Sequence, residues 1–290
     1  MTAVAAVTPY ELVNTRHGPM LINRNDVYMG QALMLYGECC EIELQFLLAL
    51  ARLPGLAIEV GANMGIHTIP MAQQLARQDR TLFAFEPQPV IFQQLCANLA
   101  LNGLMNVRAL PYACGSENGP LVFEVPDYCK TGNFGGTAMS GLSSPAAAQE
   151  SSRREIVQCV RLDAIVSDGA IGLLKIDVEG FELEVLKGSE GIFARCNPLL
   201  YVENDRVDKS PELIQWIFDR GYRLWWHIPP LFNPANFRGV SENCYGNIRS
   251  CNMLGIHKSV QIPVEGLAEI VDPGFHPFAD KPGPDGVSPS

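Results

Sequence analysis

Residues 56–68 read LAIEVGANMGIHT, and this stretch decides the fold class. Its first five residues form a short apolar run, which predicts a buried β-strand. Gly61 and Gly65 predict a tight turn, because glycine lets the backbone bend and approach a ligand where a Cβ would clash. Residues 65–76 then predict a helix. A strand, a glycine-rich turn and a helix in this order are typical of an α/β protein with a parallel sheet.

The same alternation extends along most of the chain. Further strands are predicted at 81–86, 107–110, 171–177, 198–204, 222–226 and 252–256, and helices at 38–52, 89–101, 181–187 and 211–220. Strands that are apolar throughout and alternate with helices indicate a doubly wound, mostly parallel sheet with both faces covered. In such sheets ligands bind beyond the carboxyl ends of the strands. Residues that directly follow strands are therefore the candidates for function.

Composition and charge limit the function classes. The 290 residues are 47% hydrophobic and 18% charged, with a formal net charge of −10 and no dense Lys/Arg run. A nucleic-acid partner is not expected, because binding phosphates needs a basic face. Neither a signal peptide nor a membrane-spanning apolar stretch is visible, which favours a cytoplasmic protein without a membrane partner. The nine cysteines are scattered without a CxxC spacing, which favours reduced thiols over a disulfide framework or a zinc site.

Acidic residues stand at the ends of the first two predicted strands. Glu59 ends the strand at 56–60, where a carboxylate suits a ligand with a cationic amino group. Glu86 ends the strand at 81–86, where an acid can accept the two hydroxyls of a ribose. These positions predict a nucleotide-like cofactor that also carries an amino group.

Two later strands are also followed by polar side chains. Asp177 and Glu179 follow the strand at 171–177, whose Lys175 is a candidate for a structural ion pair. Glu203 and Asn204 end the strand at 198–204. If these strands are neighbours, two carboxylates and an amide converge, and such oxygen ligands suit Mg²⁺.

Four segments together resemble the FkbM family of S-adenosylmethionine-dependent methyltransferases. They are EVGANMGIHT (59–68), FAFEPQPVIFQQLCANLALNG (83–103), KIDVEGFELEVLKG (175–188) and YVEN (201–204). The resemblance implies a Rossmann-like class I methyltransferase sheet of seven strands with an antiparallel last strand. It also implies O-methylation of a hydroxyl on a sugar, glycan or secondary metabolite. It places the S-adenosylmethionine site at Glu59, Gly61, Asn63, Gly65, Thr68 and Glu86, with Asp177 beside the methyl group.

Two mechanisms stay open at this point. In one, Asp177, Glu203 and Asn204 bind Mg²⁺ and orient the acceptor hydroxyl, an arrangement that resembles the metal site of catechol-type O-methyltransferases. Glu203 departs from that pattern, in which an Asp is usual. In the other, no metal takes part, and Glu203 or His227 acts as the general base. His227 lies in the aromatic segment WWHIPPLFNPANF (225–237).

Periodicity and composition also divide the chain. Residues 1–52 are expected to form an N-terminal helical extension, 53–260 the methyltransferase domain with a loop insertion at about 127–153, and 261–290 a C-terminal tail. The expected partner is a small-molecule or carbohydrate acceptor, and the choice between a monomer and a homodimer stays open. Competing interpretations are a metal-free N-methyltransferase, a nicotinamide-dependent oxidoreductase and a non-catalytic scaffold. The absence of a third glycine after 56–60 counts against the oxidoreductase.

Overall fold

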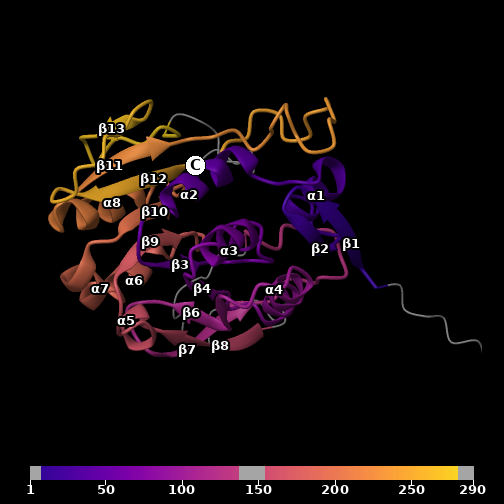
Figure 1. The fold of residues 1–290 in the computed structure, drawn as a ribbon, viewed down its shortest axis with the longest axis horizontal. Coiled ribbons are helices and arrows are strands. Elements are labelled where there is room, and N and C mark those ends of the chain that lie inside the picture. Colours follow the sequence, from indigo (N-terminus) through magenta and orange to yellow (C-terminus); the bar gives the residue numbers. More distant parts are fainter. Residues whose placement is uncertain (1–7, 137–153, 280–290) are drawn as a thin grey trace, which may run out of the picture.

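The computed structural model describes residues 8–136 and 154–279, and a mixed sheet of eight strands runs through its centre (Figure 1). In spatial order the strands are β13 (Ala268–Ile270), β11 (Tyr222–His227), β12 (Asn252–His257), β10 (Leu199–Glu203), β9 (Ile171–Ile176), β3 (Leu56–Val60), β4 (Leu82–Phe85) and β5 (Val107–Leu110). The five strands from β10 to β5 pair in parallel, whereas β12 is antiparallel to both of its neighbours. The prediction of a doubly wound, mostly parallel sheet whose last strand, β12, is antiparallel is confirmed, and the short edge strand β13 adds an eighth strand to the seven expected.

The strand order reverses between β3 and β9. From β3 the chain continues to β4 and β5 on one side, and it later returns to add β9 and β10 on the other side. Such a reversal opens a crevice at the carboxyl ends of the two central strands. The fold therefore places the ends of β3 and β9 where the sequence predicts ligand contacts.

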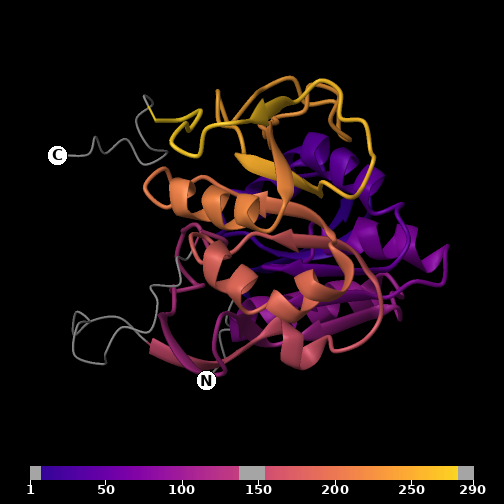
Figure 2. The same cartoon turned by 90° about the vertical axis from the view of Figure 1, so that its left-hand side faces the viewer.

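Helices cover both faces of the sheet. One layer contains α5 (Leu162–Ile165), α6 (Glu182–Lys187), α7 (Glu190–Cys196) and α8 (Ser210–Asp219), and the other contains α2 (Glu41–Leu50), α3 (Thr68–Ala76) and α4 (Pro89–Leu101). Figure 2 shows the later helices, in salmon and orange, on the opposite side of the strands from the earlier, violet ones. Side chains of β3 alternate between the layers: Ile58 and Val60 pack toward α5–α8, and Ala57 packs toward α2 and α3.

The N-terminal segment differs from the expected helical extension over residues 1–52. Residues 10–23 form an antiparallel hairpin of β1 (Tyr10–Thr15) and β2 (Gly18–Asn23), followed by α1 (Met29–Tyr36). The hairpin packs on α4, where the Asn98 side chain accepts a hydrogen bond from the Leu21 backbone N–H at 2.6 Å. Alternating burial at Met20 and Ile22 is the period-two signal that identifies the strand.

The C-terminal segment also differs from the expected tail over residues 261–290. Residues 268–270 form the edge strand β13, which pairs with β11. His276 is buried, and its Nε2 lies 2.9 Å from the backbone oxygen of Asn204. β13 and His276 therefore pack against the sheet, while 280–290 lie outside the described residues.

A second, three-stranded sheet flanks the large one. It is ordered β6 (Tyr112–Cys114), β8 (Arg154–Val160) and β7 (Gly119–Glu124). The loop insertion expected at about 127–153 connects β7 to β8, and its part at 137–153 lies outside the described residues. Among the described residues, no helix combines the length and the apolar character that a membrane span would need.

The turn after β3 depends on Gly61. This residue has a φ of 85°, in the left-handed region that favours glycine. A Cβ at this position would also overlap the backbone carbonyl oxygen of Asp177, at the end of the neighbouring strand β9. The close approach of these two backbones fixes the relative position of the two strand ends.

We expect Gly61→Ala to lower the free energy of unfolding by about 3 kcal/mol or more, because backbone strain and a steric overlap add. The matched control is Gly103→Ala, at a φ of 64° with no atom within 4 Å of the place that the added methyl group would occupy. There only the strain of about 1–2 kcal/mol applies. Urea denaturation of both variants measures the difference, and equal losses would show that the contact with Asp177 does not constrain the turn.

Candidate active site

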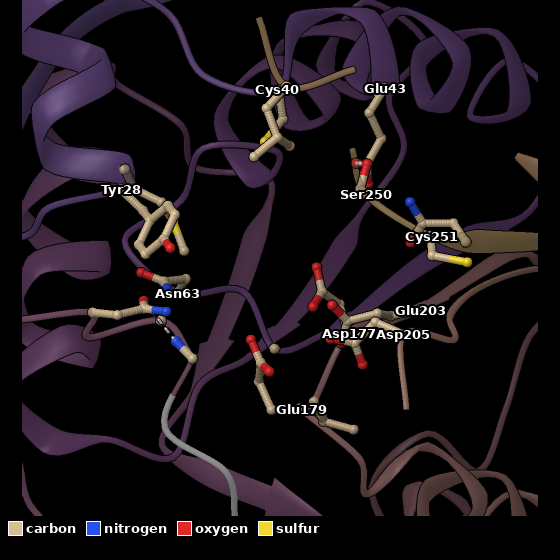
Figure 3. A pocket seen from close by; sticks show the side chains of 18 of the residues that line it. Tyr28, Cys40, Glu43, Asn63, Asp177, Glu179, Glu203, Asp205, Ser250 and Cys251 are labelled. Atoms are coloured by element: carbon tan, nitrogen blue, oxygen red, sulfur yellow. Dashed lines mark hydrogen bonds between the residues drawn. The ribbon is translucent and has the colours of Figure 1, made fainter. Parts of the chain in front are cut away.

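A cavity of about 840 Å³ lies at the carboxyl ends of the central strands (Figure 3). Its wall includes residues that follow β3, β4, β9 and β10, among them Ala62, Pro87, Val178 and Asp205. The remaining walls come from segments distant in sequence. They include residues 28–29, Cys40 and Glu43 near the N-terminus, Asn133 and 135–136 after β7, 247–252 at the start of β12, and 278–279 near the C-terminus. The N-terminal and C-terminal segments thus complete a cavity that the sheet begins.

Lys175 forms a buried ion-pair centre beside this cavity. Its side chain is 1% exposed, and its Nζ lies 3.0 Å from Asp177 Oδ2 and 3.4 Å from Glu59 Oε1. Burial opposes the charge of Lys175, yet the two carboxylates outweigh it and raise the pKa of the lysine. Burial likewise opposes ionisation of Asp177, and the ammonium group of Lys175 outweighs it and lowers the pKa of Asp177. Lys175 and Asp177 are therefore both charged at neutral pH.

Glu59 is held by the protein on both of its oxygens. Thr68 Oγ1 donates a hydrogen bond of 2.6 Å to Oε2, and Lys175 lies beside Oε1. Glu59 lines the cavity but is only 1% exposed. Its carboxylate ties the end of β3 to the start of α3 and to β9, which fixes the glycine-rich turn between them.

Glu86 lies at the end of β4 and lines the cavity. Its Oε2 accepts the backbone N–H of Asn63, and its Oε1 accepts that of Gln88, each at 2.9 Å. Burial raises the pKa of Glu86 to about 7, and the two backbone donors offset only part of this effect. A carboxylate has about four lone-pair sites, so both oxygens retain acceptor capacity toward the cavity.

Carboxyl groups gather on another part of the wall. Figure 3 shows Asp177, Glu203 and Asp205 grouped together. Burial, followed by the nearby charge of Asp177, raises the pKa of Glu203 well above its ordinary value. Glu203 in turn contributes a hydrogen bond to Asp177. Two carboxyl groups this close together are more stable when they share one proton than when both carry a negative charge.

Arg206 compensates the remaining acids at this wall. Its Nη2 lies 2.6 Å from Glu179 Oε2, and its Nε lies 3.4 Å from Asp205 Oδ1. Oxygens of Glu179, Glu203 and Asp205 lie within 4.8 Å of one another. The guanidinium group already supplies this trio with a positive charge.

The structure brings most of the predicted site residues to the cavity. Glu59, Gly61, Asn63, Glu86, Asp177 and Glu203 all line it. Two predicted cofactor residues lie behind the wall: Thr68 is fully buried against Glu59, and Gly65 lets α3 pack closely on Leu95 of α4. Both positions shape the turn without reaching the cavity.

The expected Mg²⁺ set of Asp177, Glu203 and Asn204 does not form. The Asn204 side chain is buried away from the cavity, where its Nδ2 donates to Ser210 Oγ at 2.9 Å and contacts Met253 Sδ at 3.2 Å. Its amide nitrogen is committed to the start of α8, and its backbone pairs with Cys251 and His276. The residues present therefore do not fit the expected metal.

His227 is likewise absent from the cavity wall. Its Nδ1 lies 2.8 Å from the Tyr201 hydroxyl, and its ring packs on Phe46 with 4.2 Å between centroids. Burial lowers the pKa of His227 to about 4. This histidine is a neutral member of the packing between β11 and α2, which corrects the expectation of a general base.

Sequence reasoning missed several wall residues. Cys40 and Glu43, at the start of α2, line the cavity, as does Ser250 before β12. Ser250 Oγ donates to Glu43 Oε2 at 2.7 Å, although the two residues are 207 positions apart. No local sequence pattern predicts such a contact. The adjacent cysteines at 39 and 40 were the only feature of the sequence that pointed to this segment.

Comparisons with known proteins identify relatives by sequence. Residues 59–224 match the family profile described as the methyltransferase FkbM domain. The chain is similar to the methyltransferase sdnD of Sordaria araneosa, with 31% identity over 165 residues, or 48% of this chain and 62% of that protein. It is 27% identical to the hexuronic acid methyltransferase AglP of Haloferax volcanii over 52% of this chain and 56% of that protein. The matches to these two relatives thus span less than two thirds of their length.

A longer match is found with 31-O-demethyl-FK506 methyltransferase FkbM of Streptomyces tacrolimicus. It is 27% identical and covers 74% of this chain and 91% of that protein. Among solved structures, methyltransferase FkbM of Methylobacillus flagellatus KT superposes with a TM-score of 0.42 and 15% identity, covering 69% of this chain and 43% of that one.

Proposed function

The chain belongs to the FkbM family of methyltransferases, and we propose that it transfers a methyl group from S-adenosylmethionine to a hydroxyl of a small, uncharged acceptor. A sugar, a glycan or a secondary metabolite would carry such a hydroxyl. The observation that carries the proposal is Glu86, whose carboxylate is clamped by two backbone N–H groups at the end of β4 and lines an acid-rich cavity.

The residues around the glycine-rich turn fit the cofactor. Glu86 can accept the two ribose hydroxyls, because each oxygen keeps a lone pair that the backbone does not use. Asn63 adopts a left-handed φ of 49° and directs its own N–H to Glu86, so that the turn and the carboxylate form one unit. A sulfonium cation is favoured in a cavity that carries many carboxylates.

The charge of the cavity supports an uncharged acceptor. Among the described residues of its wall, the acids are Glu43, Glu59, Glu86, Asp177, Glu179, Glu203 and Asp205, against the bases Arg206 and Arg249. Arg206 is paired with acids, and Arg249 Nε donates to the Ile228 carbonyl at 3.0 Å. An anionic acceptor would meet seven acidic side chains, and among the described wall residues only Arg249 offers it a positive charge that no acid already pairs with. The proposed acceptor therefore differs from the uronic acid in the name of AglP.

The proposed chemistry is an in-line displacement without a metal at Asp177. Bound S-adenosylmethionine supplies a methyl group activated by the positive sulfur. Asp177, which Lys175 keeps ionised, would accept the proton of the acceptor hydroxyl, and the cofactor would supply the methyl group and retain the C–S electron pair on its sulfur. The hydrogen bond from Glu203 stabilises the ionised form of Asp177. Orientation of the hydroxyl at about 3–3.5 Å from the methyl carbon supplies much of the rate.

Cofactor affinity is expected to depend on pH through Glu86. Its carboxyl, with a pKa of about 7 in the unliganded protein, is protonated below that pH and then offers the ribose a weaker acceptor. S-adenosylhomocysteine should therefore bind about tenfold more weakly at pH 6 than at pH 8, because roughly a tenth of the carboxyl is ionised one unit below its pKa. Calorimetric titration measures this, and Glu86→Gln should weaken binding and remove its pH dependence. The exposed control Glu117→Gln should retain both, and a pH-independent wild type would contradict the role of Glu86.

Transfer of labelled methyl groups tests the reaction itself. A panel should pair a neutral glycoside with its uronic acid and add a primary amine of similar size. We expect label on the neutral glycoside, and Asp177→Asn should lower kcat by about 10²–10⁴-fold. The control Asp208→Asn changes an exposed acid outside the cavity wall and should leave kcat unchanged. Preferred labelling of the amine or the uronic acid would overturn the proposed acceptor class.

A further inference from the structure

Three side chains of different chemistry meet on a part of the cavity wall that the proposed reaction does not use. They are the Cys40 thiol, the Glu43 carboxylate and the His67 imidazole, and one ligand atom from each lies within 4.8 Å of the others. Figure 3 shows Cys40 and Glu43 together on one side of the cavity. All three residues line the cavity. The fold brings them together because Cys40 and Glu43 begin α2, His67 precedes α3, and these helices share one layer.

The imidazole of His67 has an unused nitrogen inside this group. Its Nε2 is buried and has no hydrogen-bond partner among the described residues. A buried polar nitrogen without a partner is destabilising, so such atoms are rare in folded proteins. Because this nitrogen lies among other potential ligand atoms, a cation bound by the group would give it a partner.

The other two donors are also held in place. Glu43 is 4% exposed, and Ser250 Oγ donates to its Oε2 at 2.7 Å. Cys40 is a free thiol whose Sγ lies 3.5 Å from that of Cys39. Ligands of metal sites are commonly oriented by such outer hydrogen bonds.

The local charge favours an additional cation. The positive charge of Lys175 is already shared between Glu59 and Asp177, at 3.4 and 3.0 Å. Glu43 adds a third carboxylate to this neighbourhood. A divalent ion bound by one carboxylate, one thiolate and a neutral imidazole forms a neutral unit, which avoids burying a net charge.

We propose that Cys40, Glu43 and His67 bind a divalent cation of the zinc class, with a fourth position open to the cavity. Sulfur, nitrogen and oxygen donors together select such an ion over Mg²⁺ or Ca²⁺. Three protein ligands with one open position form the arrangement of a non-structural zinc site.

The acidic trio elsewhere in the cavity is the competing cation site. Glu179, Glu203 and Asp205 offer oxygen only, and Arg206 already pairs with two of them. The donor type and the guanidinium charge both favour the site at Cys40. The two sites can be distinguished experimentally because only one of them contains sulfur.

Cobalt titration of the full chain under reducing conditions tests the proposal without depending on methyl transfer. Co²⁺ bound through Cys40 should give a thiolate-to-cobalt charge-transfer band that saturates at one equivalent, and Zn²⁺ should abolish it. Cys40→Ser should remove the band, and His67→Gln should weaken binding strongly. Ser250→Ala, which removes only the hydrogen bond to Glu43, should weaken binding by about 10–100-fold. The control Cys129→Ser removes an exposed thiol outside the cavity wall and should leave the titration unchanged.

Three outcomes would overturn the proposal. One is the absence of a charge-transfer band in a wild-type chain that is folded by circular dichroism. Another is a band that survives in Cys40→Ser. The third is Co²⁺ binding that is lost in Glu203→Gln and retained in His67→Gln, which would assign the cation to the acidic trio.

Discussion

The ion pairs of Lys175 are the interaction on which the rest of the site depends. An ammonium group on the central strand β9, with a side-chain exposure of 1%, would be strongly destabilising without compensation. The parallel register places Glu59 of β3 directly beside Lys175, and Asp177 follows two residues later, just past the end of β9. One buried cation therefore links the ends of both central strands. It keeps Asp177 ionised at the cavity and holds Glu59 at the start of the glycine-rich turn.

The cavity has two parts with different origins. The carboxyl ends of β3 and β4 provide Gly61, Asn63 and Glu86, which suit the nucleoside end of a cofactor. Segments from the two ends of the chain provide the opposite wall, where Glu43 and Ser250 meet. Family membership is defined by residues 59–224, which contain the first part and none of the second. The acceptor preference is accordingly expected to reside in the segments outside that range.

Much of the sheet could be predicted from sequence because its strands are apolar and short. The strands at 56–60 and 107–110 were predicted with the bounds that the structure has. The positions of Glu86 and Asp177 at the ends of predicted strands also placed them correctly at the cavity, because the carboxyl ends of parallel strands meet at one edge of the sheet. The edge strand β13 and the N-terminal hairpin were missed, because three residues give no periodicity and the hairpin gains its burial from α4.

Side-chain direction explains the errors at the site. Asn204 follows Glu203 by one residue, and successive side chains point to opposite sides, so its amide reaches Ser210 of α8 instead of the cavity. His227 is separated from β10 by the inserted strand β12, and its ring packs against Phe46. The meeting of Cys40, Glu43 and His67 depends on how α2 lies beside α3, which no local pattern encodes.

The most direct test of the central claim is the stability of Lys175→Met, measured by denaturant unfolding beside the matched variant Lys187→Met. Lys187 pairs with Glu184 at 2.8 Å, but its side chain is 37% exposed. If the buried cation organises the site, Lys175→Met should lower the free energy of unfolding by about 3–5 kcal/mol, because two carboxylates lose their partner. Lys187→Met should lower it by about 1 kcal/mol or less. A Lys175→Met protein as stable as the wild type would contradict the account.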